Sequence, residues 1–162
     1  MNILFPGRFQ PFHNVHLRIL KRLLKKGRVI ILIGSSDLLD KENPFTATQR
    51  KKMIWAAVKA AGITAKIRFL PHEADDEKWA AHLLRHVPRK LFDAVFTNNP
   101  RVIRQLKKHK IPVVRGKMIE RGKYSATRVR KLLRRGKLKE VAKLVPDAVA
   151  SLLIRQCKIS IE

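Results

Sequence analysis

The stretch that decides the fold of this chain is residues 5–16, which read Phe5-Pro6-Gly7-Arg8-Phe9-Gln10-Pro11-Phe12-His13-Asn14-Val15-His16. An apolar segment runs into a turn that contains Gly7, and leucines at helical spacing follow the turn. This order predicts a buried strand, a tight turn and a helix. A helix that begins directly after such a turn presents unpaired N–H groups and the positive end of its dipole at one point. Because Arg8, His13 and His16 lie at that point, the stretch predicts a site for phosphate.

Strand and helix signals alternate along the rest of the chain. Apolar runs predict strands at residues 1–5, 28–34, 63–70, 94–97 and 111–114. Capping signals predict helix starts at Thr46 with Gln49, at Asp75 or Asp76, and at Asn99 with Pro100. The last part of the chain is predicted to be helical at about residues 126–135, 138–144 and 147–156.

This alternation is typical of right-handed strand–helix–strand units. It predicts an α/β fold, with a Rossmann-like parallel sheet of about five strands, helices on both faces and a helical C-terminal end. We expect a single domain over residues 1–162, with a helical C-terminal subdomain from about residue 125. Ligands of such sheets bind outside the carboxyl ends of the strands.

The charge of the chain points to anionic partners. There are 37 Lys and Arg against 12 Asp and Glu, which gives a net charge of +25. A surface of this charge attracts polyanions, so solvated basic helix faces and nucleic-acid binding are both open interpretations. The basic residues are spread along the whole chain without interleaved aromatic side chains, so no base-stacking module stands out. Non-specific nucleic-acid binding is therefore an alternative role rather than the leading one.

Cysteine usage and hydropathy bear on the compartment. Cys157 is the single cysteine, which excludes an internal disulfide framework or a cysteine-rich zinc site and fits a reducing cytoplasm. No apolar run reaches the roughly 18 to 20 residues that a membrane span needs, and no secretion signal is evident. We expect a cytoplasmic protein that does not cross a membrane.

Two clusters carry the candidate chemistry. His13 and His16 are three residues apart, and a metal-binding pair or two partly buried histidines are the alternatives to anion binding; no third metal ligand is evident nearby. The second cluster runs from Tyr124 to Arg130, with Ser125 as the predicted N-cap of a helix. That helix would again offer free N–H groups, and Arg130 would reach back toward an anion. An ordinary cap on a basic surface helix is the alternative here.

Together the two clusters resemble the nucleotidyltransferase superfamily, whose members carry an H-x-G-H motif after the first strand and a Ser/Thr-rich helix start that ends in Arg. The resemblance narrows to the archaeal nicotinamide-mononucleotide adenylyltransferases over roughly residues 1–150. The residues that carry it are Gly7-Arg8-Phe9-Gln10-Pro11, His13, His16, Asn43-Pro44-Phe45-Thr46-Ala47, Arg50, Trp79, Asn99-Pro100, Tyr124-Ser125, Thr127 and Arg130.

The resemblance implies a reaction and its partners. This family transfers the adenylyl group of ATP to the 5′-phosphate of nicotinamide mononucleotide, which gives NAD and pyrophosphate without a covalent enzyme intermediate. It implies Mg²⁺ bound through the ATP phosphates and a homo-oligomer, often a hexamer. Because no third ligand is evident near the histidine pair, we expect no metal site made by the protein alone.

The resemblance also implies residue roles. His13, His16 and Arg130 would contact the ATP phosphates and stabilise the charge that develops on the departing pyrophosphate. The remaining implied ATP contacts are Gly7, Arg8, Phe9, Ser125 and Thr127. The implied mononucleotide contacts are Arg50, Asp75, Trp79 and Asn98, with Trp79 stacking on the nicotinamide ring. From spacing alone, Trp79 is equally a core residue, Arg50 an exposed helix residue and Asn98 a turn residue, and Asp76 and Glu73 compete with Asp75.

The sequence departs from the family pattern at two motif positions. Val15 stands where the first motif has Gly, and Ala126 replaces a Gly in the second. Glycine in the first motif lets a ligand approach the backbone closely, so Val15 predicts a locally different pocket. The acidic loop before Trp79 also looks short. The acceptor is therefore left open among nicotinamide mononucleotide, nicotinate mononucleotide, flavin mononucleotide and phosphopantetheine.

Overall fold

The computed structural model describes residues 1–116 and 125–159, with side chains up to residue 156. Tyr124, the first residue of the second cluster, lies outside the described residues. The chain divides into two compact units. The sheet unit comprises Met1–Arg8, Ile19–Leu38 and Ala65–Met118, and the helical unit comprises Phe9–Arg18, Leu39–Thr64 and Ile119–Glu162.

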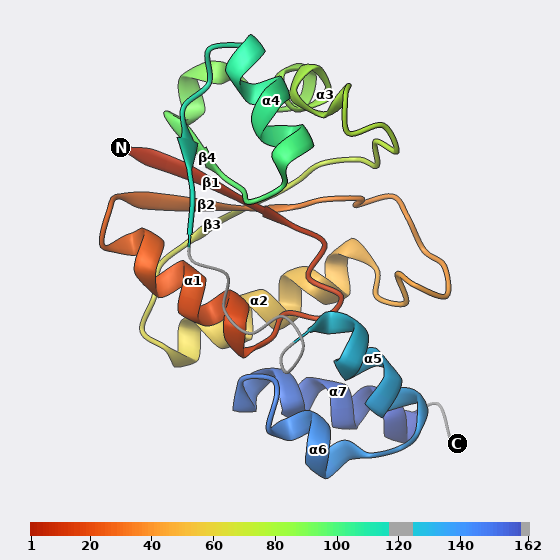
Figure 1. Ribbon diagram of the computed structural model, residues 1–162. Coiled ribbons are helices and arrows are strands. Elements are labelled where there is room, and N and C mark those ends of the chain that lie inside the picture. The colour runs from red at the N-terminus through yellow and green to blue at the C-terminus, as the bar shows by residue number, and fades with distance from the viewer. Residues whose placement is uncertain (117–124, 160–162) are drawn as a thin grey trace. The chain divides into compact units, whose positions relative to one another are not determined.

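A parallel sheet forms the centre of the sheet unit (Figure 1). Within the described residues it has five strands in the order β3-β2-β1-β4-β5. The strands are β1 (Asn2–Gly7), β2 (Arg28–Ile33), β3 (Lys66–Phe69), β4 (Ala94–Phe96) and β5 (Val113–Val114). The alternating, all-parallel arrangement predicted from the sequence is confirmed.

The predicted third strand was too long. Residues 63–70 are apolar enough to suggest a full strand, but β3 has four residues, which pair with Ile30–Ile33 of β2. β3 lies at an edge of the sheet and most of its residues are exposed. An edge strand is therefore limited by the length of backbone that its single neighbour pairs, and apolar composition does not reveal that length.

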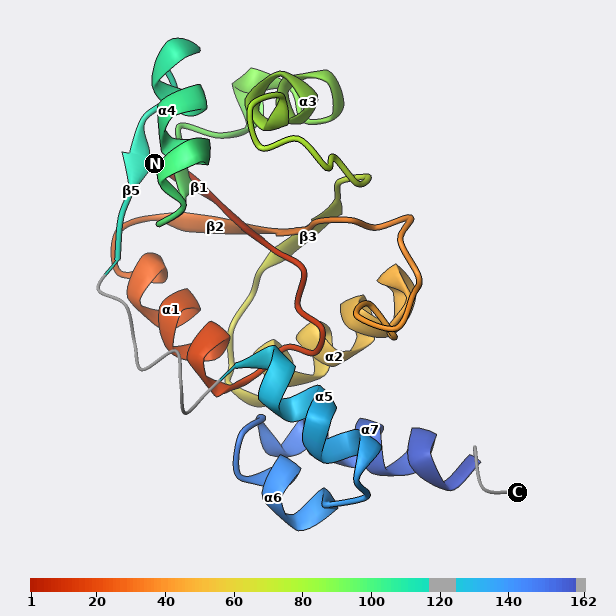
Figure 2. The ribbon, with the colours of Figure 1, turned by 45° about the vertical axis from the view of Figure 1, so that its right-hand side comes forward.

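Helices cover both faces of the sheet, as predicted. Figures 1 and 2 show α3 (Trp79–His86) and α4 (Pro100–Lys108) on one side of the sheet and α1 (Asn14–Leu24) on the other. Side chains of successive strand residues point to opposite faces. The strand side chains that face α3 and α4 pack with apolar side chains of these helices and of the adjoining loops. The members of this core are Leu4, Ile30, Leu32, Leu70, Ala80, Leu83, Val87, Phe92, Val95, Val102, Leu106 and Ile111.

The described helices of the helical unit include α2 (Ala47–Ala60), α5 (Ala126–Arg134), α6 (Leu138–Ala142) and α7 (Asp147–Ile159). Contacts join α2 to α7, α5 to α6 and α6 to α7. The three helices predicted near the C-terminus are therefore present. None of the helices in the described ranges combines the length and the apolar character that crossing a bilayer requires.

Of the four predicted helix caps, those at Thr46, Asn99 and Ser125 are confirmed and the one at Asp75 or Asp76 is wrong. Thr46 accepts from the Gln49 backbone while the Gln49 side chain accepts from the Thr46 backbone, and Asn99 caps α4 ahead of Pro100.

The cap predicted at Asp75 or Asp76 fails because these carboxylates have other partners. α3 begins at Trp79 after Lys78, with no side-chain cap. Asp75 instead accepts from the Glu77 backbone at 2.9 Å, and Asp76 accepts from the Asn99 amide at 3.3 Å. Both acids therefore stabilise the loop rather than the helix start.

The Thr46 cap provides a stability test within the helical unit. Replacing Thr46 by Ala removes the acceptor for the Gln49 N–H, and we expect the free energy of unfolding to fall by about 1 kcal/mol in urea denaturation. Thr64→Ala is the matched control because Thr64 is exposed beyond the end of α2. Equal effects of the two substitutions would contradict a specific role for the cap.

Candidate functional site

The first predicted motif forms a compact aromatic cluster in the helical unit. The rings of His13 and His16 stack with centroids 3.6 Å apart. Phe9 meets the His16 ring edge-on at 4.9 Å, and Phe12 stacks on it at 5.4 Å. Phe9 has a φ of +50°, a left-handed conformation that is uncommon for a bulky residue. The turn before α1 therefore holds the two imidazoles in fixed positions.

Hydrogen bonding determines which nitrogen of His16 carries its proton. The backbone N–H of His13 donates to Nδ1 of His16 at 3.1 Å. A backbone N–H only donates, so Nδ1 is the acceptor and the proton of the neutral ring lies on Nε2. His16 therefore carries its N–H on the nitrogen further from the backbone.

Both imidazoles are neutral near pH 7. Burial lowers the pKa of His13 from 6.5 to about 4. Loss of solvation lowers the pKa of His16 well below 6.5, and the charge of a protonated His13 would lower it further. The pair therefore offers neutral N–H donors, and the positive charge of a phosphate site must come from elsewhere.

Arg130 supplies a buried guanidinium in the same unit. Its side chain is 7% exposed. One terminal nitrogen donates to the carbonyl of Gln10 at 2.9 Å, and the other donates to Glu42 at 3.1 Å and to Thr127 at 3.3 Å. Gln10 lies three residues before His13, so the structure brings Arg130 onto the segment that carries both histidines.

Helix α5 presents Arg130 and also caps itself as predicted. Ser125 has extended backbone angles, and its hydroxyl accepts from the backbone N–H of Arg128 at 3.2 Å. Thr127 is exposed in the first turn, and its hydroxyl accepts from Arg130. The start of α5 therefore combines the positive end of a helix dipole, two hydroxyl groups and a guanidinium, which together suit an anion.

Sequence reasoning missed two residues of this site, Gln10 and Glu42. The Gln10 amide donates to the carbonyl of Phe45 at 2.9 Å and accepts from its N–H at 3.0 Å. This double hydrogen bond fastens the 9–16 segment to the loop before α2, and the Glu42 carboxylate joins that loop to Arg130. The sequence signals were the Gln in the first quoted motif and the acid directly before Asn43.

Three buried polar atoms of this unit have no hydrogen-bond partner among the described residues. They are Nδ1 of His13, Nε of Arg130 and Oδ1 of Asn43. Leaving a buried donor or acceptor unpaired costs about 1–3 kcal/mol, so such atoms need an explanation. They lie on the three segments that Arg130, Gln10 and Glu42 join, and a polar ligand there would supply partners.

Two further positions of this unit differ from simple expectation. Arg50 is fully buried in α2, which excludes the exposed-helix alternative, and its Nε donates to the carbonyl of Thr46 at 3.4 Å. Val15, which replaces the motif glycine, is 7% exposed. The branched side chain of Val15 is therefore packed away from solvent.

The other predicted site residues belong to the sheet unit. Gly7 ends β1, where its carbonyl accepts from Gly34 at 2.9 Å, and Arg8 follows it with an exposed side chain. Asn98 accepts from the backbone N–H of Gly116 at 3.2 Å. Asp75 is exposed, with Lys78 3.8 Å away.

Trp79, the remaining predicted site residue of the sheet unit, is half-buried against the core under α3 and α4. Trp79 is therefore in part a core residue, as the alternative interpretation expects, and the rest of its side chain is exposed.

A polar cluster in the sheet unit was also missed. Ser35 follows β2 and its hydroxyl lies 2.9 Å from Nδ1 of His72, which follows β3. The backbone N–H of His72 donates to Asp37 at 2.7 Å, and this hydrogen bond lowers the pKa of the Asp37 carboxyl. The cluster lies at the carboxyl ends of two strands, the edge where ligands of parallel sheets bind.

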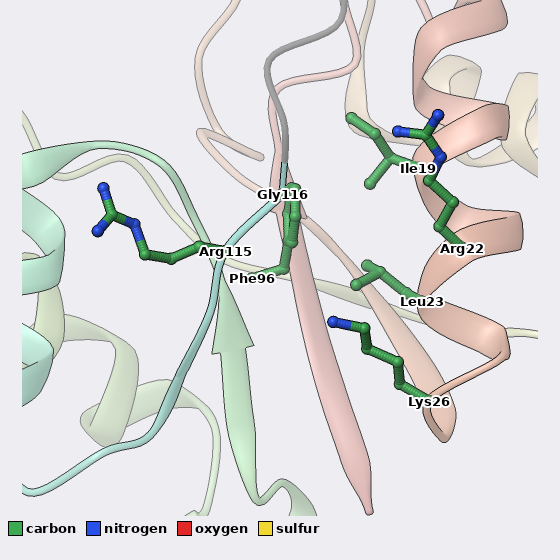
Figure 3. Close-up of a pocket in the computed structure, with 7 residues that line it drawn as sticks. All are labelled: Ile19, Arg22, Leu23, Lys26, Phe96, Arg115 and Gly116. Atoms are coloured by element: carbon green, nitrogen blue, oxygen red, sulfur yellow. The ribbon is translucent and has the colours of Figure 1, made fainter.

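One pocket of the sheet unit, about 230 Å³ in volume, contains none of the predicted site residues (Figure 3). In Figure 3, Leu23 of α1 and Lys26 of the turn after α1 project toward Phe96. The lining residues are Ile19, Arg22, Leu23, Lys26, Phe96, Arg115 and Gly116. Exposed cations over an apolar floor are expected anywhere on so basic a chain, so the pocket assigns no ligand.

The described part of the chain contains no cluster of side chains that could bind a metal ion. No group of three or more His, Cys, Asp or Glu residues there has an arrangement that could hold a metal ion. The His13–His16 pair lacks a third such ligand in those residues.

Comparison with known proteins places the chain in a family. The sequence model of the Cytidylyltransferase-like family matches residues 4–132. The nicotinamide-nucleotide adenylyltransferase of Archaeoglobus fulgidus is 38% identical over 161 residues, which cover 94% of this chain and 90% of that protein. The enzyme of the same name from Methanocorpusculum labreanum is 38% identical over 93% of this chain and 88% of its own length.

Two solved structures share the fold. The NadR protein in complex with NAD and AMP-PNP matches 91% of this chain and 45% of its own, with a TM-score of 0.62 and 14% identity. Thermotoga maritima TmcAL bound with alpha-thio ATP matches 97% of this chain and 56% of its own, with a TM-score of 0.59 and 15% identity. These chains are about twice as long as the part that matches, and they support the fold alone. The chain thus belongs to the Cytidylyltransferase-like family, in the group of the archaeal nicotinamide-nucleotide adenylyltransferases.

Proposed function

We propose that this protein transfers the adenylyl group of ATP to nicotinamide mononucleotide, which gives NAD and pyrophosphate. The observation that carries the proposal is the buried Arg130 guanidinium, held on the segment of His13 and His16. Buried polar atoms of the same unit have no hydrogen-bond partner among the residues that the structure describes. The archaeal relatives named for this activity support the choice of reaction. We also propose that Ser125 and Thr127, at the start of α5, contact ATP.

The proposed chemistry needs no nucleophilic side chain. A 5′-phosphate oxygen of the mononucleotide forms a bond to the α-phosphorus of ATP, the bond to the bridging oxygen breaks, and pyrophosphate leaves with the electron pair. Such transfers depend on positioning and on neutralising charge. ATP enters as its magnesium complex, with the metal on the phosphate oxygens.

Each residue of the helical unit then has a distinct task. Arg130 supplies positive charge and a planar fork of donors to the β- and γ-phosphates. His13 and His16 each contribute an N–H donor of a neutral ring to the same phosphates, because burial lowers their pKa and keeps the rings uncharged near pH 7. Arg50 is proposed to neutralise phosphate near the bond that forms.

Further contacts are proposed for residues of the sheet unit, and these rest on the family resemblance. Gly7, Arg8 and the main chain of Phe9 are proposed ATP contacts, the last from the helical unit. Asp75 and Asn98 are proposed contacts of the mononucleotide. The exposed part of Trp79 is proposed to stack on the cationic nicotinamide ring.

A panel of acceptors tests the reaction. Purified protein with ATP and Mg²⁺ is expected to form NAD and pyrophosphate in equal amounts from nicotinamide mononucleotide, measured by chromatography. Nicotinate mononucleotide, flavin mononucleotide and phosphopantetheine are expected to react with a lower kcat/KM. No NAD above a control without enzyme would contradict the proposal, and faster turnover of another acceptor would reassign the substrate.

Assembly is proposed on the family resemblance, and location on the single cysteine of the sequence. We expect a homo-oligomer, with a hexamer as the family's frequent form, in the cytoplasm. A charge of +25 per chain opposes close assembly unless anions offset it, so the measured mass is expected to depend on salt. Light scattering after size exclusion at low and high salt measures this.

A further inference from the structure

The ion pair between Glu42 and Arg130 joins an exposed carboxylate to a buried guanidinium. Their charged atoms lie 3.1 Å apart, and the side chains are 59% and 7% exposed respectively. Glu42 sits in a turn that Asp40 organises. The Asp40 carboxylate accepts from the backbone N–H of Glu42 at 2.8 Å, and from the backbone and side chain of Asn43 at 2.9 and 3.0 Å. Glu42 is therefore held in place by its loop as well as by its ion pair.

Glu42 is the charged partner of Arg130 among the contacts described for it. The other two acceptors, the Gln10 carbonyl and the Thr127 hydroxyl, are neutral. A buried guanidinium without a counter-charge is strongly destabilising. The carboxylate therefore neutralises Arg130 while no anion is bound.

A phosphate group would require the same donors. Carboxylate and phosphate oxygens both bind the guanidinium fork, and two anions close together repel each other. One terminal nitrogen of the Arg130 fork already donates to Glu42, whereas the loop has a second attachment through Gln10 and Phe45. Loss of the ion pair would therefore release Glu42 without detaching the whole loop.

We propose that Glu42 is the resident counter-ion of Arg130, which a bound triphosphate displaces, so that Glu42 sets the affinity of the site for polyphosphate. The proposal rests on the proposed function for the identity of the ligand. It assigns to Glu42 an effect on affinity that is opposite to that of a ligand-binding residue: removal of its charge tightens binding.

Matched variants test the proposal with inorganic tripolyphosphate, which needs no acceptor and no catalysis. Glu42→Gln is expected to lower the Kd for tripolyphosphate about three- to fivefold in titration calorimetry, as expected for a partly exposed ion pair. Glu140→Gln is the control, because Glu140 also forms an ion pair at 3.1 Å, with Lys137, and its loss changes the net charge equally. Its Kd is expected to stay close to that of the wild type.

A second, more conservative variant tests the same proposal if Glu42→Gln fails to fold. Glu42→Asp keeps the charge but draws the carboxylate back by one methylene, and its Kd is expected to lie between those of the wild type and Glu42→Gln. Equal tightening by Glu42→Gln and Glu140→Gln would overturn the proposal, because it would show a general effect of charge. Weaker binding by Glu42→Gln would overturn it as well, because Glu42 would then position Arg130 for the ligand.

The same experiment separates this proposal from the proposed function. If Glu42→Gln tightens tripolyphosphate binding but the wild type forms no NAD, the counter-ion role stands and the reaction is wrong. If NAD forms but the wild type and the Glu42→Gln, Glu42→Asp and Glu140→Gln variants bind tripolyphosphate equally, the reaction stands and the counter-ion role is wrong. Failure of every variant to bind tripolyphosphate overturns the counter-ion role.

Discussion

Replacing Arg130 by Lys is expected to lower kcat/KM for ATP by about 100-fold, as for loss of one preorganised donor group to a developing charge. The substitution keeps the positive charge. A lysine ammonium is a point charge on a flexible stem, and it does not reproduce the planar fork that reaches Gln10, Glu42 and Thr127 at once. The loss is expected mainly in kcat, because the guanidinium binds the phosphate oxygens most strongly in the transition state, when negative charge develops on the departing pyrophosphate.

The control for this prediction lies on the same helix. Arg134 is exposed near the end of α5, and Arg134→Lys is expected to leave kcat/KM within twofold of the wild type, as for surface substitutions in general. Arg130→Lys should also be compared by urea denaturation, because its side chain is buried. A loss of activity that only mirrors the fraction unfolded would assign Arg130 a purely structural role.

Acidification is expected to destabilise the protein through His13. The folded state holds the pKa of His13 at about 4, whereas the unfolded chain has the ordinary value of 6.5. Between these values the unfolded chain binds more protons, so the free energy of unfolding falls as the pH falls from 6.5 to 4 and is level above 6.5. The difference in pKa corresponds to about 3 kcal/mol. His16 acts in the same direction.

Two histidine variants isolate this effect. In urea denaturation, His13→Gln is expected to lose about 3 kcal/mol less stability than the wild type between pH 7 and pH 4. His109→Gln is the control, since His109 is exposed at the end of α4, and its stability curve should run parallel to that of the wild type. A constant difference between His13→Gln and the wild type at all pH values would contradict the burial of a neutral His13.

Several features of the fold follow from neighbours in sequence. The capping box of Thr46 and Gln49, the Asn99 cap and the Ser125 cap involve groups within three residues of each other. The parallel direction of the strands could be expected from the alternation with helices, since a strand–helix–strand crossover leads to parallel pairing. The length of β3 and the start of α3 escaped prediction because the pairing of an edge strand and the use of Asp75 and Asp76 depend on the surrounding chain.

The sequence by itself determined the candidate chemistry, because residue types and their spacing specify which groups exist: two imidazoles, one guanidinium and a helix start near hydroxyls. Only the tertiary structure decided their state. Arg130 meets Gln10 across 120 positions and Glu42 across 88, and Gln10 meets Phe45 across 35. Burial by such distant neighbours keeps His13 neutral and supplies Arg130 with its counter-ion. Solvation and charge pairing depend on everything within a few ångströms in space, and a linear pattern does not contain that information.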